Sequence, residues 1–117
     1  NSENIANLSE ISPRAAVLEA WRFVELAALD CAKRLYGEVK FSNKTMTFSA
    51  IRLLENYKDF PSNVSSQLKN LRSLRNEAAH ASEFQLTTES ALEYSRLASQ
   101  LVENLNAIKI TSKEIKS

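Results

Sequence analysis

The residues best suited to chemistry lie together in the stretch LRSLRNEAAHA, residues 71–81. This stretch holds His80, the single histidine of the chain, five positions after Arg75. A histidine titrates near neutral pH and can therefore move a proton to or from a reacting hydroxyl group. An arginine presents a planar fork of donors that suits an anion such as a phosphate. The pair could therefore serve proton transfer and anion binding at one site.

Arg75 falls on the apolar face of the helix that this stretch is expected to form. At about 100° per residue, it lies near the middle of an arc made by Val64, Leu68, Leu71, Leu74 and Ala78. A buried unpaired charge is costly, so Arg75 must find a carboxylate, extend to solvent or line a cleft. His80 projects about 140° away from Arg75 on an ideal helix. The two side chains therefore converge only if the helix end distorts or a second subunit completes the site.

Other roles for these residues stay open. His80 at a helix C-terminus is favourable through the helix dipole alone, and Arg75 could pair with Glu25 or Glu77. Glu77 and His80 also form a Glu-x-x-His pair, which supplies two ligands from one helix in di-iron bundles. Such a site needs a second pair and further inward glutamates, and each chain has only one pair. We therefore expect no metal and no cofactor.

The rest of the sequence predicts helices. The chain has 117 residues, of which 44% are hydrophobic, with only one glycine and two prolines. Turn signals are therefore too few for a sandwich or barrel. The first helix is expected between Ser12 as N-cap and Gly37, with Pro13 at its first position. Its apolar stripe comprises Val17, Trp21, Val24, Ala28, Cys31 and Leu35. The lone cysteine in this stripe predicts a buried thiol in a reducing compartment.

Two more helices are expected before the linker that follows residue 80. Residues 47–60 read as a shorter helix that ends before Pro61. Ser62 or Asn63 can cap a third helix, which runs to His80 and carries the reactive stretch. This third helix is therefore the element that orients the candidate site.

A fourth helix completes the expected core. Thr87 or Thr88 can cap it, and its apolar side holds Ala91, Tyr94, Ala98, Leu101, Val102, Leu105 and Ile108. Amphipathic helices cannot bury their stripes singly, so the predicted fold is all-α, a four-helix up-and-down-like bundle. Residues 12–108 form its single domain, after a loose polar lead-in over 1–11 and before a polar tail over 109–117.

The formal net charge of +1 limits the partners of the chain. It gives no global basic field toward nucleic acid or an anionic membrane, so any anion site must be local. No apolar run approaches the roughly 18 residues of a membrane span, and the start shows no signal-peptide pattern. We expect a cytoplasmic segment without direct membrane insertion, and an anchor upstream of Asn1 stays open.

The reactive stretch resembles the signature of the HEPN superfamily, compact helical domains named for nucleotide binding in higher eukaryotes and prokaryotes. That signature is an arginine, usually followed by a polar residue, then three variable residues and a histidine. The matching residues here are Arg75, Asn76, Glu77, Ala78, Ala79 and His80. The preceding LRSL and the opening PRAAVLEAWRFVE look like the bacterial and phage-borne branch of HEPN-like domains. The resemblance covers residues 12–108.

This resemblance implies a homodimer in which signature residues of two subunits line one cleft. In active members it implies a metal-independent endoribonuclease, in which the RNA 2′-hydroxyl attacks the adjacent phosphate and leaves a cyclic phosphate end. Carried onto this chain, His80 is the acid or base, Arg75 binds the phosphate, and Asn76 orients the phosphate or holds His80. The expected biological role is a toxin or defence effector, with a cognate antitoxin as a further candidate partner.

Arg72 and Lys69, one and two turns before Arg75, could extend a basic strip along an RNA backbone, although both also suit a solvated face. Many HEPN domains lack activity and serve as dimerisation or partner-binding modules. The alternative function is therefore a non-catalytic HEPN-like module, acting as the cytosolic domain of a larger protein.

Overall fold

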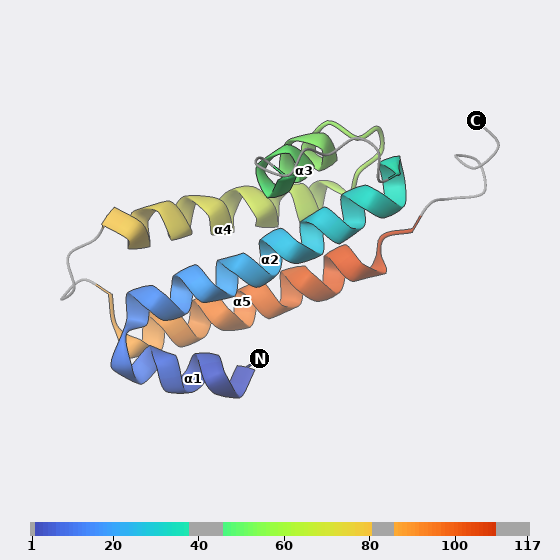
Figure 1. Cartoon of the computed structure of the whole chain (residues 1–117). Coiled ribbons are helices and arrows are strands. Elements are labelled where there is room, and N and C mark those ends of the chain that lie inside the picture. Colours follow the sequence, from blue (N-terminus) through green and yellow to red (C-terminus); the bar gives the residue numbers. More distant parts are fainter. Residues whose placement is uncertain (1, 38–45, 81–85, 110–117) are drawn as a thin grey trace.

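The computed structural model describes residues 2–37, 46–80 and 86–109, and within these ranges all regular structure is helical. The elements are α1 (Ser2–Ile11), α2 (Pro13–Tyr36), α3 (Met46–Glu55), α4 (Ser62–His80) and α5 (Thr88–Ala107) (Figure 1). The all-α class is confirmed. None of these helices is both long enough and apolar enough to cross a membrane.

The central element is α2, which contacts each of the other four helices. Near its start, Arg14 Nε donates to the Ala78 carbonyl at the end of α4 over 3.0 Å, so α2 and α4 are antiparallel. Near its end, Arg34 donates to the carbonyls of Leu105 and Ile108, over 2.7 and 3.2 Å. Because these carbonyls close α5, α2 and α5 run parallel, as Figure 1 shows.

This parallel pair distinguishes the fold from an up-and-down bundle, in which α2 and α5 would be antiparallel. The cause is α3, which has only ten residues and lies at the end of the molecule where α2 stops (Figure 1). The Tyr36 hydroxyl donates to the Leu53 carbonyl over 2.9 Å and ties the end of α3 to the end of α2. The chain therefore starts α4 at that same end.

The loose lead-in expected over residues 1–11 is wrong, because residues from Ser2 onward form α1. Ile5 is buried, and Leu8 packs against the core from the same helix. The Ser9 hydroxyl is fully buried and donates to the Ile5 carbonyl over 2.9 Å. Thus two apolar residues at helical spacing stabilise a segment of polar composition, and α1 packs on α2 and α5 as a fifth helix.

The predicted limits of α2 and α5 are confirmed. The Ser12 hydroxyl accepts from the Ala15 backbone N–H over 3.2 Å, and Gly37 closes α2 with a φ of 91°. A positive φ favours glycine, which has no Cβ to clash with the backbone. At α5, Thr87 is the cap, and its hydroxyl accepts from the Ser90 backbone N–H over 3.0 Å.

The limits of α3 and α4 differ from the prediction. α3 ends at Glu55 rather than near residue 60. The Asn56 side-chain amide and backbone N–H both donate to the Arg52 carbonyl, and a turn follows. α4 begins at Ser62 itself, and the Pro61 carbonyl accepts from the Ser65 N–H over 3.0 Å. Ser62 therefore lies inside the first turn rather than before it.

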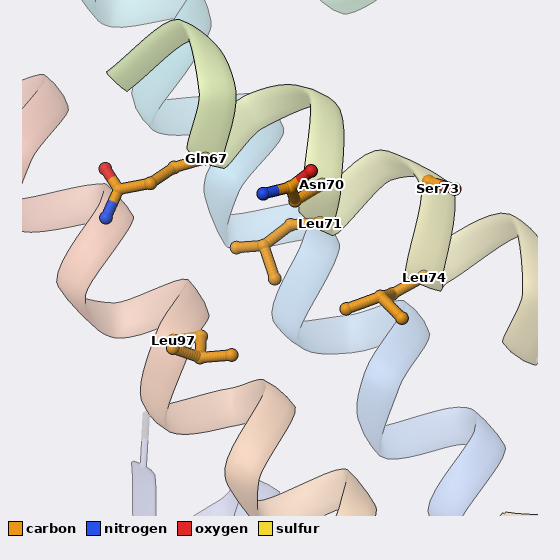
Figure 2. A pocket seen from close by; sticks show the side chains of 6 residues that line it. All are labelled: Gln67, Asn70, Leu71, Ser73, Leu74 and Leu97. Carbon is orange, nitrogen blue, oxygen red and sulfur yellow. The ribbon is translucent and has the colours of Figure 1, made fainter. Parts of the chain in front are cut away.

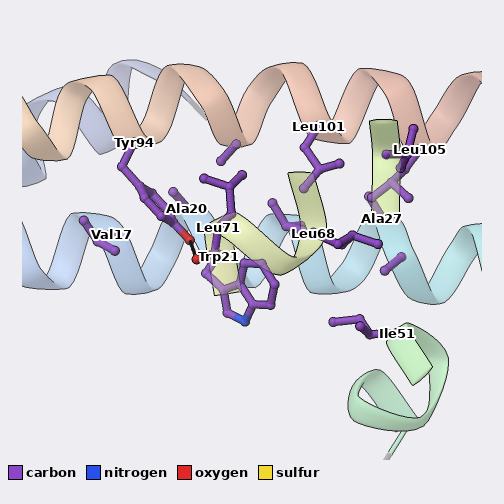
Figure 3. Packing of buried hydrophobic residues seen from close by; sticks show 14 of the residues in the cluster. Val17, Ala20, Trp21, Ala27, Ile51, Leu68, Leu71, Tyr94, Leu101 and Leu105 are labelled. Atoms are coloured by element: carbon purple, nitrogen blue, oxygen red, sulfur yellow. Dashed lines mark hydrogen bonds between the residues drawn. The ribbon is translucent and has the colours of Figure 1, made fainter. Parts of the chain in front are cut away.

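The core lies where α2, α4 and α5 face one another, and Figure 3 shows it from close by. Trp21 is buried with 4% exposure and Cys31 is fully buried, as predicted. On α4, Leu68 and Leu71 fill the space between the other two helices (Figure 3). Leu74 departs from the predicted apolar arc because 45% of it is exposed. Most of the expected linkers and of the polar tail lie outside the described residues.

Candidate functional site

The helix that carries the signature, α4, continues unbroken to His80. Five residues along an α-helix correspond to a rise of about 7.5 Å and a rotation of about 140°. Arg75 and His80 therefore leave α4 in different directions within one copy. Of the two ways to bring them together, a distorted helix end is not what the described residues show. Completion of the site by a second copy of the chain stays a prediction.

Arg75 has an incomplete set of partners. Its Nη1 donates to the Asn76 side-chain oxygen over 3.1 Å, while its Nε is buried without a hydrogen-bond partner among the described residues. The ion pairs within 4 Å that the described ranges contain do not include Arg75. The pairing with Glu25 or Glu77 is therefore not formed there.

Tyr94 of α5 marks the inner side of α4, next to Arg75. Its hydroxyl is buried and donates to the Leu71 carbonyl over 2.9 Å, which joins α5 to α4 (Figure 3). Burial raises the pKa of Tyr94 well above its ordinary value, whereas the nearby Arg75 charge lowers it and Glu25 raises it. Tyr94 thus stays neutral near pH 7, with the charge of Arg75 nearby.

The other two signature residues face solvent. Asn76 and His80 are both exposed, and His80 is the last residue of α4. The structure brings Asn76 to Arg75 through the hydrogen bond between them. Asn76 and His80 are four residues apart on α4 and therefore lie on the same side of the helix, without a hydrogen bond between their side chains in the described part of the chain. Asn76 therefore connects the half-buried Arg75 with the exposed surface of α4.

The two residues predicted to bind an RNA backbone lie in different surroundings. Arg72 Nη2 lies 3.4 Å from Glu55 Oε2, in an ion pair that joins α4 to α3. Glu55 is mostly shielded, since its side chain is 17% exposed. Lys69 is exposed and has no ion-pair or hydrogen-bond partner in the described part of the chain. Lys69 is thus the more available cation of the two.

Sequence reasoning missed a pair of apolar hollows between α4 and α5. Figure 2 shows the first, of about 400 Å³, with Leu71 and Leu74 directed toward α5 and Leu97 directed back. The second, of about 450 Å³, shares Leu74 and Leu97 and reaches Glu77 and Tyr94. None of the five predicted site residues lines either hollow. The signal for these hollows in the sequence was Leu74, which lies at the edge of the predicted apolar arc of α4.

Sequence reasoning also missed Arg14, which lies in the opening phrase that resembles HEPN domains. Its bond to the Ala78 carbonyl places a guanidinium against the last turn of α4, close along the chain to His80. A cation at a helix C-terminus is favourable because the carbonyls there carry partial negative charge. Arg14 thus anchors the end of α4 that presents His80.

No three His, Cys, Asp or Glu side chains gather closely enough to hold a metal ion within residues 2–37, 46–80 and 86–109. No protein-family model, curated protein or solved structure matches this chain. The resemblance of residues 75–80 to the HEPN signature therefore stays a prediction, and function is argued from the site.

Proposed function

We propose that this chain is a HEPN-like domain that forms a homodimer and cleaves RNA, without a metal ion, at a cleft lined by both copies. The observation that supports this most is the state of Arg75. A buried donor without a partner costs about 1–3 kcal/mol, and such groups in native proteins call for an explanation. A phosphate that reaches Arg75 from outside would supply acceptors to the guanidinium.

The geometry of α4 supports a dimer. Arg75 and His80 diverge on a straight helix, so one copy alone offers a phosphate binder and an acid or base on separate faces. In a symmetric dimer the same surface is used twice, and each copy contributes equivalent residues to the shared region. His80 of one copy can then act on a phosphate held by Arg75 of the other.

The proposed reaction balances with these groups alone. The RNA 2′-hydroxyl gives its proton to a neutral His80 while its oxygen forms a bond to the adjacent phosphorus. The bond from phosphorus to the 5′-oxygen breaks, and that oxygen takes a proton from a protonated His80. The products are a cyclic phosphate and a 5′-hydroxyl. Proton transfer of this kind contributes about 10² to 10⁴ in rate, and Arg75 stabilises the charge on the phosphate.

The test is cleavage of total cellular RNA by the purified protein in excess chelator, with the ends of the fragments identified. We expect cyclic phosphate ends, and a rate at least about 100-fold lower for His80→Ala and for Arg75→Ala. Arg96→Ala is the matched control, because Arg96 is an exposed arginine of α5 that is paired with Glu93. It should leave the rate unchanged. Such an activity would suit a cytoplasmic toxin or defence effector.

The second candidate is a non-catalytic HEPN-like module that forms the same kind of dimer. The exposure of Leu74 and the apolar hollows beside it favour this candidate, since surface apolar patches often mark interaction sites. A protein that is folded and dimeric in solution and leaves RNA intact would replace the nuclease with this module.

A further inference from the structure

The charges of the two facing helices are segregated although the whole chain carries only +1. α4 holds Lys69, Arg72 and Arg75 against one carboxylate, Glu77, which gives +2 with neutral histidine. α5 holds three glutamates against one arginine, which gives −2. α4 is therefore the local basic element that an anionic ligand would prefer.

One line of α4 consists entirely of exposed hydrogen-bond donors. Its residues alternate at spacings of four and three, so they follow one strip of the helix surface. We call this the outer strip of α4, and it comprises Ser62, Ser66, Lys69, Ser73, Asn76 and His80. Every one of these residues is exposed, and none is a carboxylate. Two signature residues and the available cation Lys69 thus share one surface line.

The solvent-facing line of α5 has a different composition. It comprises Glu89, Glu93, Arg96, Gln100 and Glu103, all of them exposed. Its single cation is engaged, because Nε and Nη2 of Arg96 both donate to the Glu93 carboxylate. Both lines are exposed and follow the same helical spacing, so they differ mainly in charge. Only the line of α4 offers donors without carboxylates that would repel an anion.

We infer that a single strand of RNA binds along the outer strip of α4, with Lys69 and Ser73 holding its phosphates on the way to His80. This inference rests on the proposed function and extends it to the path of the substrate. Successive strip residues are about 4.5 to 6 Å apart along the axis, and the strip from Ser66 to His80 spans about 21 Å. One line of contacts on a convex helix suits one strand.

Ser73 adds a neutral hydrogen-bond donor to the outer strip of α4. A hydroxyl donates to a phosphate oxygen without adding charge, and phosphate contacts from serine and lysine position a strand without reading its sequence. Ser73 lies between Lys69 and Asn76 on the strip, so it fills the gap between the cation and the signature. Arg72 contributes less here, since Glu55 engages it.

The test is fluorescence anisotropy with a labelled single-stranded 2′-O-methyl RNA of eight nucleotides, which has no free 2′-hydroxyl and cannot be cleaved. Four variants each lower the net charge by one. Lys69→Gln and Ser73→Glu change the strip, while Lys58→Gln and Gln100→Glu change other exposed positions. We expect binding to weaken about fivefold or more for the strip variants and less than twofold for the controls. Lys69→Gln should also reduce the salt dependence by about 0.7 in logarithmic slope.

The outcomes separate this inference from the proposed function. Equal effects of strip and control variants, no binding of the single strand, or equal binding of a duplex would overturn the inference. If RNA is cleaved and any of these results is also found, the proposed nuclease is retained and only the RNA path along the outer strip is rejected. Strip-dependent binding without cleavage of ordinary RNA would retain the path and remove the nuclease. Circular dichroism confirms that each variant is folded.

Discussion

α4 and α5 lie side by side and differ in how they use their surfaces. In α5 the stripe of Ala91, Tyr94, Ala98, Leu101 and Leu105 is buried and holds no charged residue. Leu92 lies outside this stripe and is 42% exposed, and the outer line is a mixture of charges that is typical of a solvated face. In α4 the apolar arc is interrupted by Arg75, and Leu74 at its edge is half exposed. The outer line of α4 also lacks carboxylates. Packing thus accounts for the sequence of α5, whereas α4 keeps features that packing alone does not require.

The comparison indicates where stability and function reside. α5 packs along α2 and presents Leu101 and Leu105 fully buried, so it is chiefly structural. α4 accepts a buried donor without a partner, the Nε of Arg75, which costs stability. Sites that depart from good packing are often functional. Buried residues of α5 should therefore govern stability, as should Leu68 and Leu71 of α4, whereas Arg75, Asn76 and His80 should govern activity.

The largest expected contrast is between two leucine truncations. Leu101→Ala removes a fully buried side chain of α5 and should lower the free energy of unfolding by about 2–5 kcal/mol. Leu74→Ala removes a side chain that is 45% exposed and should cost less than about 1 kcal/mol. Urea unfolding at equilibrium measures both. Equal losses would mean that Leu74 is covered in solution, and the comparison would fail.

The next effect concerns the hydrogen bond that joins the two helices. Tyr94→Phe removes the bond to the Leu71 carbonyl and should cost about 1–2 kcal/mol near pH 7. Burial raises the pKa of Tyr94 above the unfolded value of about 10, so its contribution is complete below that pH and falls as pH rises. The parent should lose up to about 1.4 kcal/mol per pH unit more steeply than the variant above pH 10. Parallel pH curves would show that Tyr94 is solvated.

The smallest expected effect concerns the residues at the starts of α5 and α4. Thr87→Ala removes the hydroxyl that accepts from the Ser90 N–H and should cost about 1 kcal/mol. Ser62→Ala acts inside the first turn of α4 and should change stability by less than about 0.5 kcal/mol. Thermal unfolding of both variants ranks them. A larger loss at Ser62 would contradict the start that the structure assigns to α4.

Sequence reasoning predicted the parts of the fold that depend on local signals. Ser12, Pro13 and Gly37 bound α2 because caps and a positive φ act within a few residues. It failed for α1, where burial of Ile5 against distant helices decides the structure. It also failed for the direction of α5, which depends on how the short α3 sets the start of α4. Such long-range packing has no signature in a local pattern.

The candidate site was predictable in composition but not in arrangement. The signature placed Arg75, Asn76 and His80 on one helix, and the structure has them there. The engagement of Arg72 by Glu55 depends on α3 packing near α4, which no spacing in the sequence reveals. The hydrogen bond from Arg75 to Asn76 likewise depends on side-chain conformation. The role of these residues in RNA cleavage remains the proposal made above.

A mixing experiment tests whether two copies of the chain complete one nuclease site. Arg75→Ala and His80→Ala proteins, each inactive alone, are combined, unfolded, refolded together and assayed on cellular RNA in excess chelator. A mixed dimer retains one pair formed by Arg75 of one copy and His80 of the other. We expect activity well above the sum of the separate variants. Activity equal to that sum, beside an active parent, would contradict the shared cleft, and an inactive parent would contradict the nuclease.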